Sequence, residues 1–496
     1  MKRFLLSISA ILCINILFAQ QGVSFWLDSI QYEIDPVSQV DVSIYSSNNN
    51  ITVANIPETV TYNDNTYNVI SIARNAFQGR QNLVSVTIPN SVVIIGDGAF
   101  TGCQSLTTVT MSDNVASIGW GAFRYCSSLS SINIPTALTI IEQNLFQGCI
   151  SLTSITIPDN IITIEWGAFW QCSNLESVTI GNGVIEIGWD VFSDCYALQS
   201  VVIPNSVTEI GNNAFMNCWA LNSITIGENV STIGNEVFMN CINLNTLNFN
   251  VINCADFNSI DNHPFKNAPI QTINIGENVQ RIPANFAYGF NQLSTVSLPN
   301  NLTEIGEQAF YGCSSLSSIT IPNNITSIKD KTFQYCSNLT SVTLGSGLDS
   351  LGSSAFRNCS ALENINCLAS TPPTFKDNTV FAYPNSINVK VPCGSLDAYI
   401  ADYYWCSFFT GRMTEDCESS LADIEEDNLT FYPNPATNRV TFSEMIERVE
   451  LMDLTGKLIK SFENANEINI EGISSGVYFI KLHSFDKTIM QKLIKK

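Results

Sequence analysis

The stretch Gly167–Ile180, GAFWQCSNLESVTI, decides the fold because its arrangement returns every 23 residues along most of the chain. A cysteine stands three positions after the phenylalanine and a leucine six positions after it. Two β-branched residues with one polar residue between them follow. Internal repetition with a period of this length is typical of solenoids and related repeat architectures. The phenylalanines that keep this spacing are Phe77, Phe100, Phe123, Phe146, Phe169, Phe192, Phe215, Phe238, Phe310, Phe333 and Phe356.

A single unit of this kind is too small to fold alone. About seven apolar side chains would contribute about 1.5–3 kcal/mol each on burial, whereas ordering the backbone costs roughly 1–2 kcal/mol per residue. The balance improves when neighbouring units close both sides of the core, as in a solenoid. The constant register predicts parallel strands about 4.8 Å apart, with Phe over Phe and Cys over Cys. We therefore predict a mainly β solenoid of 23-residue coils over residues 71–367.

The repeat falters over residues 250–292. Phe265 comes 27 residues after the preceding phenylalanine of the series, and Phe286 stands one position ahead of register. His263 lies in the same irregular coil. A functional insertion and a tolerated bend both explain this segment, and we favour the bend.

The first residues have the pattern of a secretory signal peptide. A basic start and a short apolar run lead to Ala19, which precedes the polar Gln20, so we expect residues 1–19 to be removed by cleavage between these two. The alternative is an N-terminal membrane anchor, but the apolar run is short for a span. No later apolar run reaches roughly 18 residues, so we expect no transmembrane segment after signal removal.

Segments on either side of the repeat are expected to cap its open ends, as a solenoid requires. Residues 20–70 alternate apolar and polar residues across Asn and Asp turns, which predicts hairpins that form an N-terminal β cap. Residues 368–417 form the C-terminal cap in this interpretation, with a strand and then a short helix that starts near Ser395. Residues 418–428 are polar, acidic and unpatterned, which indicates a linker.

After the linker, residues 429–496 again alternate apolar and polar residues between Gly and Asn turns. This pattern predicts a small antiparallel β-sandwich.

Cysteine at the repeated position has four explanations: a nucleophile, a metal ligand, half of a disulfide, or a small apolar filler. Ten cannot all be nucleophiles, and the C-x-x-C or Cys/His spacing of metal sites is absent. Stacked cysteines are close enough for disulfides, but their side chains point the same way, so a continuous column cannot pair without distortion. We predict buried thiols between Phe and Leu, with disulfides as the alternative. The column comprises Cys103, Cys126, Cys149, Cys172, Cys195, Cys218, Cys241, Cys313, Cys336 and Cys359.

Five further cysteines lie outside this column and after the signal peptide. In an exported protein some of these should pair, and we expect a disulfide between Cys367 and Cys393 because both border the same capping segment. The others are Cys254, Cys406 and Cys417.

Two parts of the chain each resemble a known family. The string A-F-x-x-C-x-x-L-x-S-I-T-I-P resembles the BspA-like, or Treponema-pallidum-type, leucine-rich repeat over about residues 71–367. The resemblance implies a secreted or surface-exposed binding protein, often linked with adhesion. In residues 429–496, the order of YPNP, D-x-x-G-K, SSGVYFIKL and a basic end resembles the sorting domain of the Bacteroidota type IX secretion system. That resemblance implies passage through the periplasm, export by this machinery and removal of the domain, with surface attachment or release.

The net charge and the absence of several sequence motifs argue against some classes of function. The formal net charge of −22 repels phosphate backbones, so nucleic acid is not an expected partner. No EF-hand or RTX-type loop fixes a metal site, and no nucleophile elbow, H-E-x-x-H or phosphate-binding loop is present. We therefore expect no metal, no cofactor and no enzymatic activity; an exported hydrolase built on paired carboxylates is the least favoured alternative.

Since the repeated positions are structural, recognition should fall to variable exposed positions. Aromatic residues gather there at a density that suits contact with proteins or glycans at a cell or matrix surface. The competing explanation is that these rings only seal neighbouring turns, and a passive structural surface component is the alternative function. The candidate ligand-binding residues are Trp120, Tyr125, Trp166, Trp170, Trp189, Tyr196 and Trp219.

Overall fold

The computed structural model describes residues 22–257, 260–382, 386–417, 431–453, 457–484 and 487–496. It divides into two compact units, Met1–Asp416 and Cys417–Lys496. The expected signal peptide, its cleavage point at Ala19 and Gln20, and the linker lie outside the described residues.

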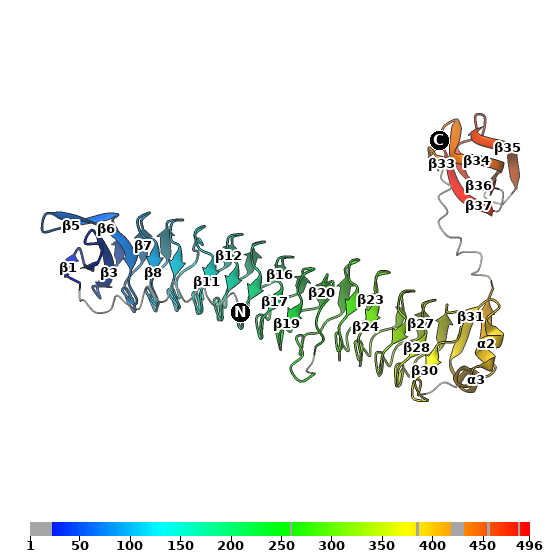
Figure 1. Ribbon diagram of the computed structural model, residues 1–496, viewed down its shortest axis with the longest axis horizontal. Coiled ribbons are helices and arrows are strands. Elements are labelled where there is room, and N and C mark those ends of the chain that lie inside the picture. The colour runs from blue at the N-terminus through cyan, green and yellow to red at the C-terminus, as the bar shows by residue number, and fades with distance from the viewer. Residues whose placement is uncertain (1–21, 258–259, 383–385, 418–430, 454–456, 485–486) are drawn as a thin grey trace. The chain divides into compact units, whose positions relative to one another are not determined.

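The first unit is a solenoid of parallel coils, drawn from blue to yellow in Figure 1. Most coils contribute one strand to a main row, which forms three hydrogen-bonded sheets with breaks between β9 and β12 and between β23 and β25. Within a sheet, Ser154 for example lies opposite Ser177 and Ile155 opposite Val178. The predicted parallel register, like over like, is therefore confirmed. The main strands are β4 (Val53–Asn55), β7 (Ser85–Ile88), β9 (Thr108–Met111), β12 (Ser154–Ile157), β14 (Ser177–Ile180), β16 (Ser200–Ile203), β18 (Ser223–Ile226), β20 (Thr246–Phe249), β21 (Thr272–Ile275), β23 (Thr295–Ser297), β25 (Ser318–Thr320), β27 (Ser341–Leu344), β29 (Asn364–Cys367), β31 (Asn388–Pro392) and β32 (Met413–Asp416).

A second row of two-residue strands follows the turn after most main strands. One residue of each pair points outward and the other, usually isoleucine, is buried, as in Glu186–Ile187. These strands are β8 (Ile94–Ile95), β10 (Ser117–Ile118), β11 (Ile140–Ile141), β13 (Thr163–Ile164), β15 (Glu186–Ile187), β17 (Glu209–Ile210), β19 (Thr232–Ile233), β22 (Arg281–Ile282), β24 (Glu304–Ile305), β26 (Ser327–Ile328), β28 (Ser350–Leu351) and β30 (Thr374–Phe375).

The third side of each coil is the turn that carries the repeated phenylalanine, which we call the ladder phenylalanine. From Phe77 to Phe265 these rings stack with centroids 5.0–5.8 Å apart. They are fully or almost fully buried. Edge and face contacts between rings add to the burial of large apolar area, so this column forms the spine of the core.

Two backbone positions in each turn explain why it can be so tight. Around Phe146, Asn144 and Gly148 have φ of 52° and 72°. The residues two before and two after the ladder phenylalanine adopt positive φ in the other coils too, except that only the second does so around Phe265. Gly, Asn and Asp tolerate this left-handed conformation best, which explains their frequency at these positions.

In the irregular segment 250–292 the core stays continuous because other residues take over the usual core positions. Phe265 stacks on Phe238 at 5.0 Å although four extra residues separate them. In the next coil, Ala287 holds the ladder position, since its amide bonds to Ala309 as other ladder amides bond to the neighbouring coil. Phe290 stands where cysteine stands elsewhere and meets Phe265 edge to face at 6.0 Å. The phenylalanines on either side of Ala287, Phe286 and Phe290, are both buried and fill the core of this coil.

Both ends of the solenoid are capped, as predicted. At the front, strands β1 (Ser24–Leu27), β2 (Ile30–Ile34), β3 (Asp41–Ser47), β5 (Thr59–Tyr62) and β6 (Asn65–Ile72) cover the first coil; neighbouring strands are antiparallel except β3 and β6, which are parallel. At the back, helices α2 (Leu396–Ala401) and α3 (Tyr403–Phe409) bury Tyr399, Trp405 and Phe409. The predicted helix start near Ser395 matches the N-cap of α2.

The second unit is small and antiparallel, as predicted, but its five described strands form one hydrogen-bonded sheet instead of the two packed sheets of a sandwich. Its own core includes Val440, Val449, Ile480 and Leu493. The strands are β33 (Phe431–Tyr432), β34 (Arg439–Met452), β35 (Leu458–Asn469), β36 (Gly476–Ser484) and β37 (Lys487–Lys495).

Candidate functional site

The candidate aromatic residues all lie on one edge of the solenoid. We call this the turn edge; it comprises the residues from three before to four after each ladder phenylalanine. Six of the seven are exposed, with Trp189 the most accessible at 59%, and Trp170 is half-buried. The turn edge therefore presents indole and phenol rings to solvent on four of the five coils from Phe123 to Phe215.

The first group on this edge is Trp120, Arg124 and Tyr125. The Arg124 guanidinium lies 4.6 Å from the centroid of the Tyr125 ring and 5.8 Å from that of Trp120. Arg124 also donates a hydrogen bond of 3.1 Å to the Tyr125 hydroxyl. Cation–π contacts of this kind hold both rings in place, and the Tyr125 ring also rests on Gly148 of the next coil, where a Cβ would lie 2.4 Å from it.

The second group pairs tryptophans with carboxylates. Trp166 Nε1 donates to Asp190 Oδ2 at 3.2 Å, and Trp170 Nε1 donates to Asp194 Oδ2 at 3.0 Å. Partial burial raises the pKa of Asp190, although the hydrogen bond from Trp166 opposes this shift. Each indole is thereby oriented by the coil that follows it.

The third group joins two successive coils, those of Phe192 and Phe215. The rings of Tyr196 and Trp219 stack with centroids 4.2 Å apart and planes 21° apart. Trp189 covers Gly211 of the next coil, since a Cβ there would lie 2.5 Å from the indole. These rings both seal turns and remain exposed, so the two explanations drawn from the sequence are not exclusive. Rigid, half-exposed rings are well suited to binding because little entropy is lost when a ligand stacks on them.

Sequence reasoning missed a second set of aromatic residues on the same edge. The rings of Tyr288 and Tyr311 are parallel, with centroids 4.6 Å apart, and Tyr335 meets Tyr311 edge to face at 5.4 Å. Tyr311 stands one position after the ladder phenylalanine, so its place on the turn edge could have been predicted from the sequence. Tyr288 was hidden because its coil carries Ala287 at the ladder position.

The ten column cysteines are free and buried, so the turn edge exposes none of these thiols to solvent. Each donates its S–H to the carbonyl of the ladder residue one coil back, as Cys172 does to Phe146 O at 3.2 Å. Burial raises the pKa of the Cys172 thiol well above its usual value. Since the thiolate is the reactive form, this environment disfavours both nucleophilic and metal-ligating roles.

The expected disulfide between Cys367 and Cys393 is wrong in the structure. Cys367 is a free, buried thiol 3.1 Å from the Tyr399 hydroxyl, because it ends β29 with its side chain in the core. The disulfide-bonded cysteines are Cys393 and Cys417. The error came from sequence proximity to the cap, which does not show that one side chain points inward and the other outward.

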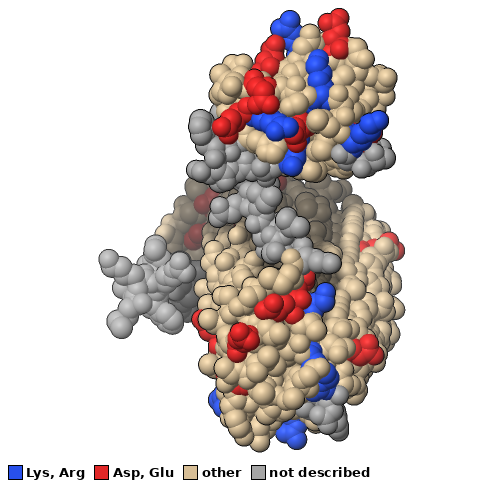
Figure 2. Space-filling view, turned by 90° about the vertical axis from the view of Figure 1, so that its right-hand side faces the viewer, with Lys and Arg blue, Asp and Glu red and all other residues tan. Residues whose placement is uncertain are grey.

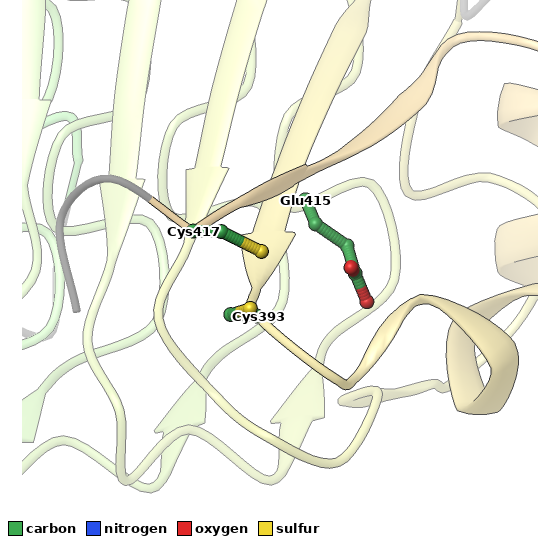
Figure 3. A group of neighbouring side chains, drawn as sticks. All are labelled: Cys393, Glu415 and Cys417. Carbon is green, nitrogen blue, oxygen red and sulfur yellow. The ribbon is translucent and has the colours of Figure 1, made fainter.

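One group of potential metal ligands occurs among the described residues: Cys393, Glu415 and Cys417, whose ligand atoms lie within 4.8 Å of one another (Figure 3). Disulfide-bonded sulfurs are not thiolate ligands, and the Glu415 carboxylate accepts hydrogen bonds from Gly394 N at 2.9 Å and Leu396 N at 3.1 Å. This carboxylate therefore caps α2, and the group does not fit a metal centre.

His263 sits in the core of the irregular coil. Its Nδ1 accepts from Phe265 N at 3.1 Å, and its Nε2 lies 2.9 Å from Asn285 O, to which it donates. Burial lowers the pKa of His263 to about 4. Both ring nitrogens are therefore engaged in holding the bend, which favours a structural role.

Charged side chains are sparse on the face seen in Figure 2, where Lys, Arg, Asp and Glu stand among mostly uncharged residues. Around the candidate residues the balance is acidic, with Asp190, Asp194 and Glu165 against Arg124. Among the described residues, no helix combines the length and apolar character needed to cross a bilayer.

Parallel coils with one main strand each, capped at both ends, define a leucine-rich-repeat solenoid. The chain belongs to the BspA type leucine rich repeat family, whose model matches residues 38–176, 139–259 and 258–388. Residues 430–496 match the secretion system C-terminal sorting domain. Together these matches identify a secreted or outer-surface protein that is handled by the type IX secretion machinery.

Solved structures of similar proteins are bacterial leucine-rich-repeat proteins. One from Bacteroides ovatus ATCC 8483 is 25% identical over 79% of this chain and 99% of that chain, with a TM-score of 0.42. A leucine rich cell surface protein from Faecalibacterium prausnitzii A2-165 is 26% identical over 73% and 99%, with a TM-score of 0.38. The T. pallidum leucine rich repeat protein is 28% identical over 45% and 91%, with a TM-score of 0.35. No curated protein matches the chain.

Proposed function

We propose that the solenoid is an adhesin-like binding module, without enzymatic activity, that holds a protein or glycan of a cell or matrix surface on its turn edge. The observation that carries this proposal is the set of exposed rings from Trp120 to Trp219, which are held by contacts within their own coil or with a neighbouring coil. Exposed aromatics held rigid in this way are typical anchors of binding surfaces.

The match to a sorting domain supports binding outside the cell. A sorting domain carries the solenoid out of the cell, where a long repeated surface can meet large or polymeric partners. A passive surface component would share the location and the fold, so only binding separates the two functions.

The test replaces Trp166, Trp189 and Trp219 by Ser in one variant. Polar residues such as Asn212 occupy the position of Trp166 and Trp189 in other coils, so the fold should tolerate the change. We expect loss of binding to an array of matrix proteins and glycans, with thermal stability close to wild type. A matched control, Trp26→Ser, removes an indole that is 56% exposed in the N-terminal cap. Equal binding by the two variants would reject the turn edge as the site, and no binding by the wild type would favour the passive component.

A further inference from the structure

We propose that a strip of the turn edge from Trp170 to Tyr335 is a track for a linear neutral polysaccharide, which lies along the solenoid axis with about one sugar per coil. The inference deepens the proposed function and rests on it for the assumption that this edge is where binding occurs. It names the ligand class and adds residues beyond the original aromatic candidates.

The centre of the strip is a ladder of side-chain amides two positions after the ladder phenylalanine. Asn217 Nδ2 donates to Asp194 Oδ1 at 2.8 Å, Asn240 Nδ2 to Asn217 Oδ1 at 3.0 Å, and Asn267 Nδ2 to Asn240 Oδ1 at 2.9 Å. An amide offers two N–H donors and two acceptor lone pairs. The ladder uses one of each on Asn217 and Asn240, so a donor and an acceptor remain on each coil, already oriented.

Aromatic rings stand at both ends of this ladder. Trp170 and the stacked pair Tyr196–Trp219 lie on the coils at its start. Tyr288 and Tyr311 lie on the two coils after Asn267. Within each stacked pair the facing sides of the two rings cover each other, so a sugar meets the outer faces and edges of the pair and the tyrosine hydroxyls. Sugar hydroxyl groups both donate to and accept from amides and phenols. The two kinds of group are therefore arranged as a sugar chain requires.

Tyr335 supplies an independent observation. It is 45% exposed and has φ of 64° at a position where the two preceding coils carry Gly289 and Gly312. A bulky residue in the left-handed region costs free energy, and such strain gathers at binding sites. Glycine would fit this turn more easily, so we attribute the presence of tyrosine at this position to its exposed aromatic ring.

A pocket opens where the track crosses the irregular coil. Its lining includes Lys266, Asn267, Tyr288, Asn291 and Gln292, so amides and a phenol surround it. It lies between the end of the amide ladder and the start of the tyrosine group, where the four-residue insertion has displaced the coils. A sugar unit or a branch can enter here without breaking the track.

Charge favours a neutral ligand. Lys266 is paired with Glu236 at 3.0 Å, and Asp194 contributes a carboxylate. Over the whole strip, Lys266 and Lys331 stand against the five carboxylates of Asp190, Asp194, Glu236, Glu307 and Asp330, so an acidic polysaccharide would meet a net negative surface. A protein partner would require a desolvated apolar centre ringed by polar groups, whereas this strip is polar in the middle and aromatic at the ends. A repeating polymer also matches a surface that repeats once per coil.

The test measures binding of the full mature chain to neutral oligosaccharides of increasing length, namely cello-, manno- and laminari-oligosaccharides, with oligoalginate as the acidic comparison. We expect saturable binding to at least one neutral series, with affinity that rises with chain length and changes little with salt. Tyr288→Ser/Tyr311→Ser should weaken it about tenfold or more. The control Tyr45→Ser/Tyr403→Ser, which removes two exposed rings in the caps, should bind as the wild type does.

A second variant guards against misfolding of the first. Asn240→Asp keeps a residue type that Asp194 already accommodates at the same position with φ of 60°, but removes both amide donors. It should also weaken binding to the neutral series. The inference is overturned if no neutral series binds, or if both variants bind as tightly as the control. Binding of a matrix protein that is lost in the Trp166, Trp189 and Trp219 variant, without sugar binding, would retain the proposed function and reject the polysaccharide.

Discussion

At the scale of single residues, the column cysteines satisfy both packing and hydrogen bonding with one side chain. Each column cysteine fills the space between phenylalanine and leucine, as expected, and its S–H also bonds to a carbonyl that would otherwise face the core. Serine would make a similar bond but would bury a more polar group, and a larger apolar residue would overpack the turn. Packing and polar satisfaction therefore both select cysteine.

Thiol labelling tests this account. In the native protein the ten column cysteines should remain unlabelled by a thiol reagent, because they are buried and their protonated form is favoured. Cys406, which is only half-buried, is the internal control and should be labelled first. Denaturant should then expose the rest, as counted by mass spectrometry. Rapid native labelling of the column would contradict the buried arrangement.

His263 gives a prediction of pH dependence. Its pKa is about 4 in the folded state, below the usual 6.5, so the unfolded chain binds the proton more readily. The contribution of His263 to stability is therefore complete above about pH 6.5 and is lost as the pH falls toward 4. Linkage gives a loss of about 2–3 kcal/mol in the free energy of unfolding by pH 4.5.

Urea unfolding of wild type and His263→Gln at pH 7.5 and pH 4.5 isolates this effect. The carboxyl groups titrate in both proteins, so their contribution cancels in the comparison. The wild type should lose about 2–3 kcal/mol more than the variant between the two pH values. An identical pH dependence would mean that His263 is not held neutral in the core.

At the scale of elements, the sequence predicted the coils, both caps, the helix near Ser395 and the antiparallel C-terminal domain. It did so because one residue type recurs at each core position and the period leaves a single register. The turn edge was only partly predictable. The exposed tryptophans could be named, but the amide ladder and the group around Tyr288 depend on side-chain directions and on a coil whose register had moved.

The irregular coil offers the clearest test of how elements compensate one another. Ala287→Phe alone should overpack the turn and cost about 1–3 kcal/mol. Phe290→Cys alone should leave a void and cost about 3–5 kcal/mol. In a Phe286→Ala background, which supplies the alanine that precedes Phe310 in the next coil, the two changes restore the order Ala309, Phe310 and Cys313. In that background the double variant should lose less stability than the two single losses added.

A double-mutant cycle of unfolding free energies measures this coupling, which we expect to reach about 1–3 kcal/mol. The matched reference is Phe310→Cys combined with Cys313→Phe, which creates the same kind of exchange in a regular coil without the insertion beside it. Additive losses for Ala287→Phe and Phe290→Cys would show that the two positions do not share one space.

At the scale of the whole molecule, the chain separates recognition from delivery. The solenoid carries the exposed rings, and the C-terminal unit, with its own core, carries the match to the sorting domain. The two functions should therefore be separable by deletion, because neither core depends on residues of the other.

Deletion of residues 429–496 provides that test. The truncated protein should accumulate in the periplasm of the native host, while its solenoid remains folded and keeps its protected thiols. Cell fractionation and surface proteolysis report the location, and the Trp166, Trp189 and Trp219 variant serves as a control that should still be exported. Surface display of the truncated protein would show that the sorting information lies elsewhere.

The like-on-like register of the coils has a genetic consequence. Where every neighbour presents the same contact surface, an unequal crossover that gains or loses one whole 23-residue unit leaves two ends that still fit. The length of the solenoid can thus change by whole coils between related strains, without new core residues. The segment around His263 is different, since its neighbours are shaped to each other; it should persist at one fixed place while the regular coils on either side vary in number.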